Sequence, residues 1–368
     1  MLSAPKARVT FIDWMRGVAA IIMLQGHTFD AFMRPADRSG AWFTFSQFFG
    51  GEAAAIFLFL TGATYGMGMN RRQHMPPGTR VLQALKRARF LFILAILFRL
   101  QGWIFAWGTS PWTDLLKVDI LNVMGATAAL LAFLALFSGI DRVRWAVIAG
   151  TVMAAVSPVI TALHLDAIPG PLRDYFVPSA AMFSIFPWGA FMAFGIAVGS
   201  LIPLVERGGW NRVMQWSALL GFGLVFGGRY FADLPFSVYA QSEFWLNSPA
   251  LVACKLGIAL LLGAFAYLWS EYLAASSWSW VRQLGTTSLL VYWVHVDLEY
   301  GPWLAKYRQQ LNVPEVLGSA VLMIAAMLGL SMAWTAVRKR RQTKAEPVSP
   351  EHTLVELPLR TEEKRRRA

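Results

Sequence analysis

Ionisable side chains lie within a stretch that is otherwise apolar enough to cross a membrane. The segment IDWMRGVAAIIMLQGHTFDAF, residues 12–32, carries Asp13, Arg16, His27 and Asp30. An imidazole can take a proton from a hydroxyl or an amine, and a guanidinium can hold an anionic group. Because an ionised side chain at mid-bilayer costs about 2.5 kcal/mol or more, these groups must face protein or water. The stretch therefore predicts group transfer within the membrane.

Arg16 and His27 share one face of the predicted helix. They are eleven residues apart, which corresponds to about 16 Å of rise and about 20° of rotation. Asp13 lies one turn before Arg16 and Asp30 lies one turn after His27, so a polar stripe follows the helix. Two plainer explanations stay open: Asp13 and Arg16 could set orientation near the cytoplasmic end, and His27 could be a neutral histidine bonded to a neighbouring helix.

A second histidine lies in the apolar segment LGTTSLLVYWVHVDLEYG. His295 is ten residues past Gly285, about 15 Å into the bilayer from the cytoplasmic side, so it reaches the depth of His27. The two histidines could line one cavity, although an interhelical hydrogen bond would explain His295 equally well. Asp297 and Glu299 follow near the predicted outer end, where a charged group is tolerated.

Two further charged residues of the apolar segments bear on the site. Glu52, at the outer start of the second segment, could partner His27 or cap a helix. Lys255 lies near the outer end of a later segment, where its side chain can snorkel to the interface. We predict His27 as a general base, with Asp30, Glu52 or His295 orienting it or the acceptor. No metal is expected, because two histidines without a third ligand at a recognisable spacing indicate a metal site only weakly.

The composition is that of an integral membrane protein. Of 368 residues, 56% are hydrophobic and 15% are charged, and the mean hydropathy is +0.48, beyond the balance of a soluble domain. The net charge of +12 would suggest nucleic acid in a soluble chain, but the basic residues cluster between apolar segments, so no nucleic-acid partner is expected. The single cysteine, Cys254, excludes a disulfide framework. Motifs for nucleotide hydrolysis and dinucleotide binding are absent from the sequence.

We predict an all-α polytopic membrane helix bundle of about ten transmembrane helices. Each span needs about 20 mostly apolar residues. The candidate spans are roughly 11–33, 48–69, 88–108, 118–137, 144–163, 180–203, 212–231, 249–269, 285–304 and 315–336. Alternate loops are basic, which predicts that both termini are cytoplasmic. Residues 1–340 are predicted to form one membrane-embedded domain and residues 341–368 a disordered, charged cytoplasmic tail.

The first apolar segment resembles a known family. IDWMRGVAAIIMLQGH resembles the first helix of the acyltransferase family three, integral membrane enzymes with an Arg, ten residues and then a His, here Arg16 and His27. AAIFLFLTGATYG resembles the second span of that family, with Thr61 where Ser is usual. LKRARFLFILAILF resembles its basic start of the third span, and LGTTSLLVYWVHVDL its late Ser-Leu-x-x-Tyr-x-x-His helix.

Other segments resemble a sister group, the heparan-α-glucosaminide N-acetyltransferase catalytic domain and its bacterial relatives. LLKVDILNVMGATAAL resembles the Asp-Ile-Leu-x-x-x-Gly helix of that group, and FPWGAFMAFGIAVGS its Pro-Trp and Gly-x-x-x-Gly helix. The resemblance covers about residues 8–337 in outline. The animal enzymes carry Asn at the position of His27 and a catalytic His in the following loop, whereas the loop MRPADRSGAWFTF has no His. The resemblance therefore implies that His27 itself takes this role.

The resemblance implies an acyltransferase of the cell inner membrane. It would move an acyl group such as acetyl from cytoplasmic acyl-CoA to a hydroxyl or amine of an envelope saccharide or similar acceptor. Because coenzyme A is polyanionic, basic groups on the cytoplasmic side could hold it, although membrane topology alone would also place such groups there. The candidate donor-binding residues are Arg16, Arg71, Arg72, Lys86, Arg87 and Arg89.

Two other functions stay open on the sequence alone. A proton-coupled transporter or flippase could use His27, His295 and Asp30 as a proton relay, but the two halves of the sequence show no internal symmetry. A noncatalytic membrane scaffold is the second alternative. The expected partners are acyl-CoA, the acceptor, the lipid bilayer and, in a homodimer, a second copy of the chain.

Overall fold

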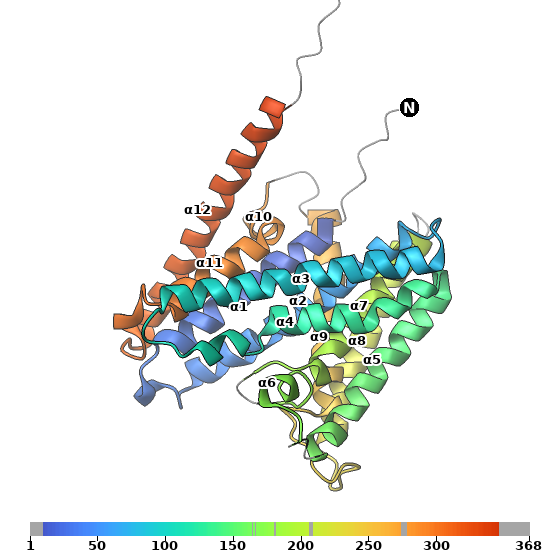
Figure 1. The fold of residues 1–368 in the computed structure, drawn as a ribbon, viewed down its shortest axis with the longest axis horizontal. Helices are drawn as coiled ribbons and strands as arrows, with labels where there is room; N and C mark the ends of the chain where they lie inside the picture. Colours follow the sequence, from blue (N-terminus) through green and yellow to red (C-terminus); the bar gives the residue numbers. More distant parts are fainter. Residues whose placement is uncertain are drawn as a thin grey trace, which may run out of the picture. The chain divides into compact units, whose positions relative to one another are not determined.

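The regular secondary structure of the described residues is helical, as the sequence predicts. This computed structural model describes residues 10–163, 165, 167–179, 182–205, 209–273 and 278–345. Within these ranges there is no strand, and an isolated β-bridge joins Met33 to Leu311. The helices (Figure 1) are α1 (Thr10–Phe32), η1 (Pro35–Asp37), α2 (Ala41–Asn70), α3 (Pro77–Phe105), η2 (Trp112–Leu116), α4 (Ile120–Leu130), η3 (Leu131–Leu136), α5 (Gly139–Ala162), α6 (Gly170–Arg173), α7 (Ile185–Leu201), η4 (Ile202–Leu204), α8 (Trp210–Ala232), α9 (Pro249–Leu268), η5 (Trp269–Leu273), α10 (Trp280–Thr286), α11 (Ser288–Tyr300), η6 (Ala305–Tyr307) and α12 (Val313–Ala345).

The chain is an all-α polytopic membrane protein. Among the described residues, seven helical segments are long and apolar enough to cross a membrane: 41–70, 77–105, 112–136, 139–162, 185–204, 249–273 and 313–342. The three other predicted spans coincide with α1, α8 and α11, which are outside these seven. In α1 the reason is visible in the sequence, because its polar stripe lowers the mean hydropathy. The count of ten spans and the cytoplasmic termini stay predictions.

The chain divides into two compact units after Ser331. The first unit holds α1 to α11 and the beginning of α12, and the second holds the remainder of α12. Since α12 continues to Ala345, helix extends into the first residues of the predicted tail. The rest of that tail, residues 346–368, lies outside the described residues.

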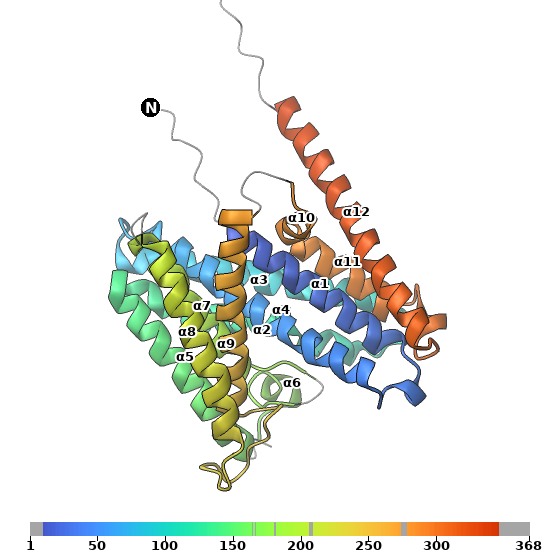
Figure 2. The same ribbon diagram turned by 180° about the vertical axis from the view of Figure 1, so that it is seen from behind.

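Helix α1 is the element around which the site is built. It packs against α2, α9, α10 and α11, and α1 and α11 lie beside each other in both views (Figures 1 and 2). A Cβ added to Gly26 of α1 would lie 2.8 Å from the Cα of Gly50 in α2, so the two backbones are in direct contact. Gln25 and Gln47 secure this contact by donating across it to the carbonyls of Ser46 and Gly26, each at 3.0 Å.

Small residues also hold α2 against α7. The predicted Gly-x-x-x-Gly segment supplies Gly195 and Gly199, and a Cβ at these positions would lie 2.0 Å from the carbonyl oxygen of Phe59 and 1.9 Å from that of Ala63. Close backbone approach over small residues is the usual way that helices associate in a membrane. Because the neighbours are backbone atoms, rotation of a side chain cannot relieve a clash here.

The Gly195→Ala variant is expected to lose stability for this reason. Overpacking of a filled contact costs about 1–3 kcal/mol, and the loss would appear as a lower midpoint of thermal unfolding in detergent. Gly223→Ala in α8 is the matched control, since an added methyl group there meets nothing within 4 Å and alanine is the better helix former. Equal unfolding midpoints for the two variants would contradict the close α2–α7 contact.

Candidate functional site

Helices α1 and α11 bring together the two histidines that the sequence singles out. Nδ1 of His27 lies 3.0 Å from Nε2 of His295, and the two rings are stacked with their centroids 5.2 Å apart. His295 is fully buried, whereas His27 is half-buried. His27 is therefore the member of the pair that a substrate could reach.

The surroundings of His295 determine which ring nitrogens carry protons. Nδ1 of His295 lies 2.7 Å from the carbonyl oxygen of Val291, and a carbonyl can only accept a hydrogen bond. Nδ1 must therefore carry the proton of the neutral ring, and Nε2 must be the acceptor. His27 then donates from its own Nδ1, which leaves its lone pair on Nε2. This is the arrangement of a base whose ring is oriented by a second group.

A buried carboxylate lies next to the histidine pair. Glu299 has no exposed surface, and its Oε1 accepts a hydrogen bond from Thr28 at 2.6 Å. The predicted position of Glu299 near the outer end of its span stays a prediction, but its side chain faces the protein interior and not an interface where charge is tolerated. The signal that could have placed it is its spacing: Glu299 follows His295 by four residues and so shares its face of α11.

Asp30 lies at the more exposed edge of this cluster. Its Oδ2 accepts a hydrogen bond of 2.8 Å from the Tyr300 hydroxyl, and the Tyr300 ring meets the His27 ring edge-on at 5.6 Å. Arg38 forms an ion pair with Asp30 at 3.7 Å and also donates to its backbone carbonyl. Asp30 is thus placed beside His27 through Tyr300, a residue that the sequence analysis did not single out.

Glu52 is paired with a partner other than the predicted one. Its Oε1 accepts from Nζ of Lys255 at 2.8 Å, and the two side chains are 5% and 6% exposed. Lys255 also donates to the carbonyl of Gly51 at 2.9 Å. The predictions that Glu52 would partner His27 and that Lys255 would snorkel to the interface are therefore corrected: the two form a buried ion pair between α2 and α9, in which each charge compensates the other.

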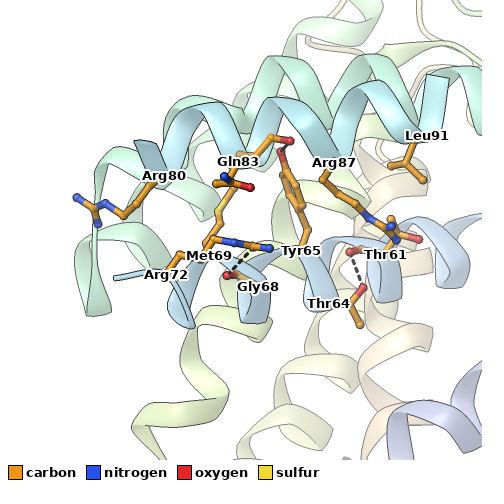
Figure 3. Close-up of a pocket in the computed structure, with 11 residues that line it drawn as sticks. Thr61, Thr64, Tyr65, Gly68, Met69, Arg72, Arg80, Gln83, Arg87 and Leu91 are labelled. Atoms are coloured by element: carbon orange, nitrogen blue, oxygen red, sulfur yellow. Dashed lines mark hydrogen bonds between the residues drawn. The ribbon is translucent and has the colours of Figure 1, made fainter. Parts of the chain in front are cut away.

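Some of the predicted donor-binding residues line a cavity, and the others do not. It has a volume of about 280 Å³ and lies between α2 and α3, lined by Arg72, Arg80 and Arg87 together with Thr61, Thr64, Tyr65, Gly68, Met69, Gln83, Ala84 and Leu91 (Figure 3). Arg71, Lys86 and Arg89 are exposed and do not line it. Arg80 lies outside the predicted set, although its spacing of seven residues from Arg87 places both on one face of α3.

The cavity and the histidine pair contact different parts of α2. Gly50 packs on α1 next to His27, whereas Thr61, which lines the cavity, is eleven residues further along, about 16 Å of helix. Arg16 also does not line the cavity, and its guanidinium lies 3.4 Å from the Asp13 carboxylate. That Arg16 and His27 face one common pocket stays a prediction.

A comparison with known protein families shows the family to which the chain belongs. Residues 8–231 match the family model described as heparan-alpha-glucosaminide N-acetyltransferase, catalytic. The match covers more than half of the 368 residues and includes His27 and the arginine-lined cavity, whereas His295 and Glu299 lie beyond it. A search of curated proteins finds no match. The chain therefore belongs to the heparan-alpha-glucosaminide N-acetyltransferase catalytic domain family.

Proposed function

We propose that this protein is a membrane acetyltransferase that moves the acetyl group of acetyl-CoA to a hydroxyl or amine of an envelope saccharide or similar acceptor in the cell inner membrane. The observation that carries the proposal is the contact between His27 and His295, with His27 on a helix that lies within the family match. The family match also favours an acetyltransferase over a transporter or a noncatalytic scaffold.

His27 acts as the general base. Its Nε2 lone pair takes the proton of the acceptor O–H or N–H as the acceptor atom attacks the thioester carbonyl carbon. The C–S bond then breaks, and the coenzyme A thiolate leaves with a proton from the His27 imidazolium. His295 is a positioning residue, because it accepts from Nδ1 of His27 at 3.0 Å and so holds the reactive nitrogen in place. Asp30 and Tyr300, at the exposed edge, contact the acceptor.

Coenzyme A binds with its phosphates in the arginine-lined cavity. Guanidinium groups pair with phosphate oxygens through two parallel hydrogen bonds, which suits Arg72 and Arg87 to this ligand. The guanidinium of Arg80 donates to the carbonyls of Leu136 and Phe137 at 3.1 and 3.4 Å, so it contributes charge at the rim. From the cavity the acyl arm extends along α2 toward His27, over the separation of about 16 Å that the helix rise gives.

Arg72→Gln and Arg87→Gln are each expected to raise the KM for acetyl-CoA by about tenfold to a hundredfold, with a smaller change in kcat. A hydrogen bond to a charged group contributes about 1.5–3 kcal/mol, and the lost contacts are made in the ground state as well as in the transition state. Steady-state kinetics against acetyl-CoA measure this. Arg71→Gln and Arg89→Gln are matched controls, because both side chains are exposed and outside the cavity. Equal KM values in all four variants would place the donor elsewhere.

The direct test of the proposed reaction uses the purified protein in proteoliposomes. It is incubated with acetyl-CoA that carries a radiolabelled acetyl group, together with a cell-envelope extract. Label is expected to move into a saccharide fraction of the extract. A folded protein that transfers no label to any acceptor, under conditions where it binds acetyl-CoA, would overturn the proposal.

A further inference from the structure

We propose that His27, His295 and Glu299 form a binding site for a divalent transition-metal ion of the zinc class. One potential ligand atom from each residue lies within 4.8 Å of the other two. Two imidazole nitrogens with one carboxylate oxygen are a ligand set that binds zinc while keeping a coordination position open. The sequence could not show this set, since α1 and α11 supply ligands that are 268 residues apart.

The spacing of the ligand atoms fits a single ion. In tetrahedral zinc sites the metal–nitrogen distance is about 2.0–2.1 Å, which places two ligand nitrogens about 3.3 Å apart. Nδ1 of His27 and Nε2 of His295 are 3.0 Å apart, so an ion could lie between them after a small separation of the rings. Ligands of one ion cannot be more than about 4.2 Å apart at these bond lengths, and a rotation of the Glu299 side chain would close the remaining gap.

The residues around the ligands already have the arrangement that metal sites need. A metal-binding histidine usually donates its other N–H to a carbonyl or carboxylate, which fixes the ring and leaves the ligand nitrogen unprotonated. His295 does so through the Val291 carbonyl at 2.7 Å. Glu299 is oriented in the same way by the Thr28 hydroxyl at 2.6 Å. The His295 ring is therefore already fixed with its ligand nitrogen unprotonated, whereas the Glu299 carboxylate has to rotate to reach the ion.

The second carboxyl oxygen of Glu299 supplies an independent argument. Its Oε2 is buried and has no hydrogen-bond partner among the residues that the structure describes. Arg308 donates to the backbone carbonyl of Glu299 and not to its carboxylate. Glu52, by contrast, has its charge compensated by Lys255 at 2.8 Å. Oε2 of Glu299 is a free ligand atom, and a divalent cation that displaced any proton from the carboxyl group would supply the partner that Oε2 lacks.

A metal ion bound in this site would prevent His27 from acting as a base. This consequence rests on the proposed function. A metal ion takes the lone pair of His27 Nδ1, and the ring proton moves to Nε2, the nitrogen that acts as base in the empty site. Zinc should therefore inhibit acetyl transfer, and a chelator should restore it. The empty and occupied sites would be the active and inactive forms of the same cluster.

The test measures metal binding separately from activity. Full-length protein purified without a polyhistidine tag is incubated with Zn²⁺, desalted and analysed by elemental mass spectrometry, and Co²⁺ is titrated with detection of its visible absorption. About one Zn²⁺ per chain is expected. Glu299→Gln and His295→Gln should bind at least about tenfold more weakly, since even groups that only orient a ligand contribute about 10–100-fold to metal affinity. His27→Gln, at a half-buried position, provides a variant that puts little packing at risk.

Two controls separate this site from adventitious binding and from misfolding. His74→Gln removes an exposed histidine and should keep the full zinc content, and unfolding midpoints that stay close to that of the wild-type protein would show that the Glu299 and His295 variants are folded. Substoichiometric zinc in the wild-type protein, or unchanged affinity in the Glu299 and His295 variants, would overturn the metal site. Stoichiometric zinc with an unchanged transfer rate would leave the metal site standing and overturn the role of His27 as base.

Discussion

Replacing His27 with glutamine is expected to lower the rate of acetyl transfer by about 10²–10⁴-fold, the usual contribution of a positioned general base. Glutamine is similar in length and stays polar, so it should preserve the packing of α1 on α11 while removing the nitrogen that can take a proton. The measurement is the initial rate of transfer from labelled acetyl-CoA, with the protein first stripped of metal by a chelator, so that the loss reflects the missing base.

The control for this variant is His74→Gln, which changes the same residue type at an exposed position between α2 and α3 and should transfer at the wild-type rate. Binding of acetyl-CoA by the His27 variant should be unchanged, because the arginine-lined cavity is separated from His27 along α2. Transfer at more than half the wild-type rate by folded His27→Gln protein would exclude His27 as the base.

Removing either member of the Glu52–Lys255 ion pair is expected to lower the free energy of unfolding by about 3–5 kcal/mol, because the other charge is left buried and uncompensated. Glu52→Met and Lys255→Met should each show this loss. The double variant should recover most of it, since replacing a buried ion pair with apolar side chains of similar volume is often neutral or stabilising. Unfolding in detergent, followed by the fluorescence of the 16 tryptophans, measures all three.

An exposed ion pair gives the comparison. Arg144 and Asp141 lie 3.3 Å apart but are 70% and 62% exposed, so Arg144→Met should cost less than about 1 kcal/mol. The buried-pair assignment predicts that the losses from the two single Glu52 and Lys255 variants do not add in the double variant. Additive losses would mean that the two side chains act independently, contrary to their 2.8 Å contact.

Under the proposed mechanism, the catalytic histidine of this chain lies at a different position from the one that the sequence resemblance implies for the animal enzymes. The sequence resemblance places their histidine in the loop after the first helix, and the corresponding loop here has none. In this structure the side chain of His27 is half-buried and directed to His295. The proposed chemistry therefore moves the base from the loop onto α1, which the His27→Gln variant tests.

The helices themselves could be predicted from the sequence. A membrane span must be apolar over about 20 residues, so hydropathy alone predicts ten segments, and each overlaps a helix of the structure. The rotation per residue is fixed within one helix, so the polar stripe of α1 and the basic groups in the first half of α3 could also be predicted from the sequence. The resemblance to the acyltransferases rested on residues within single helices, and the family match supports it.

Only the tertiary structure decided which side chains from different helices meet. Hydropathy and helical period do not determine which face of one helix contacts another, because that depends on close packing over small residues such as Gly26 and Gly50. Glu52 meets Lys255 for this reason, and His27 meets His295 and Glu299 across 268 residues of chain or more. The sequence could place each of these groups at a depth in the membrane, but the partner of a buried charge is selected by helix packing.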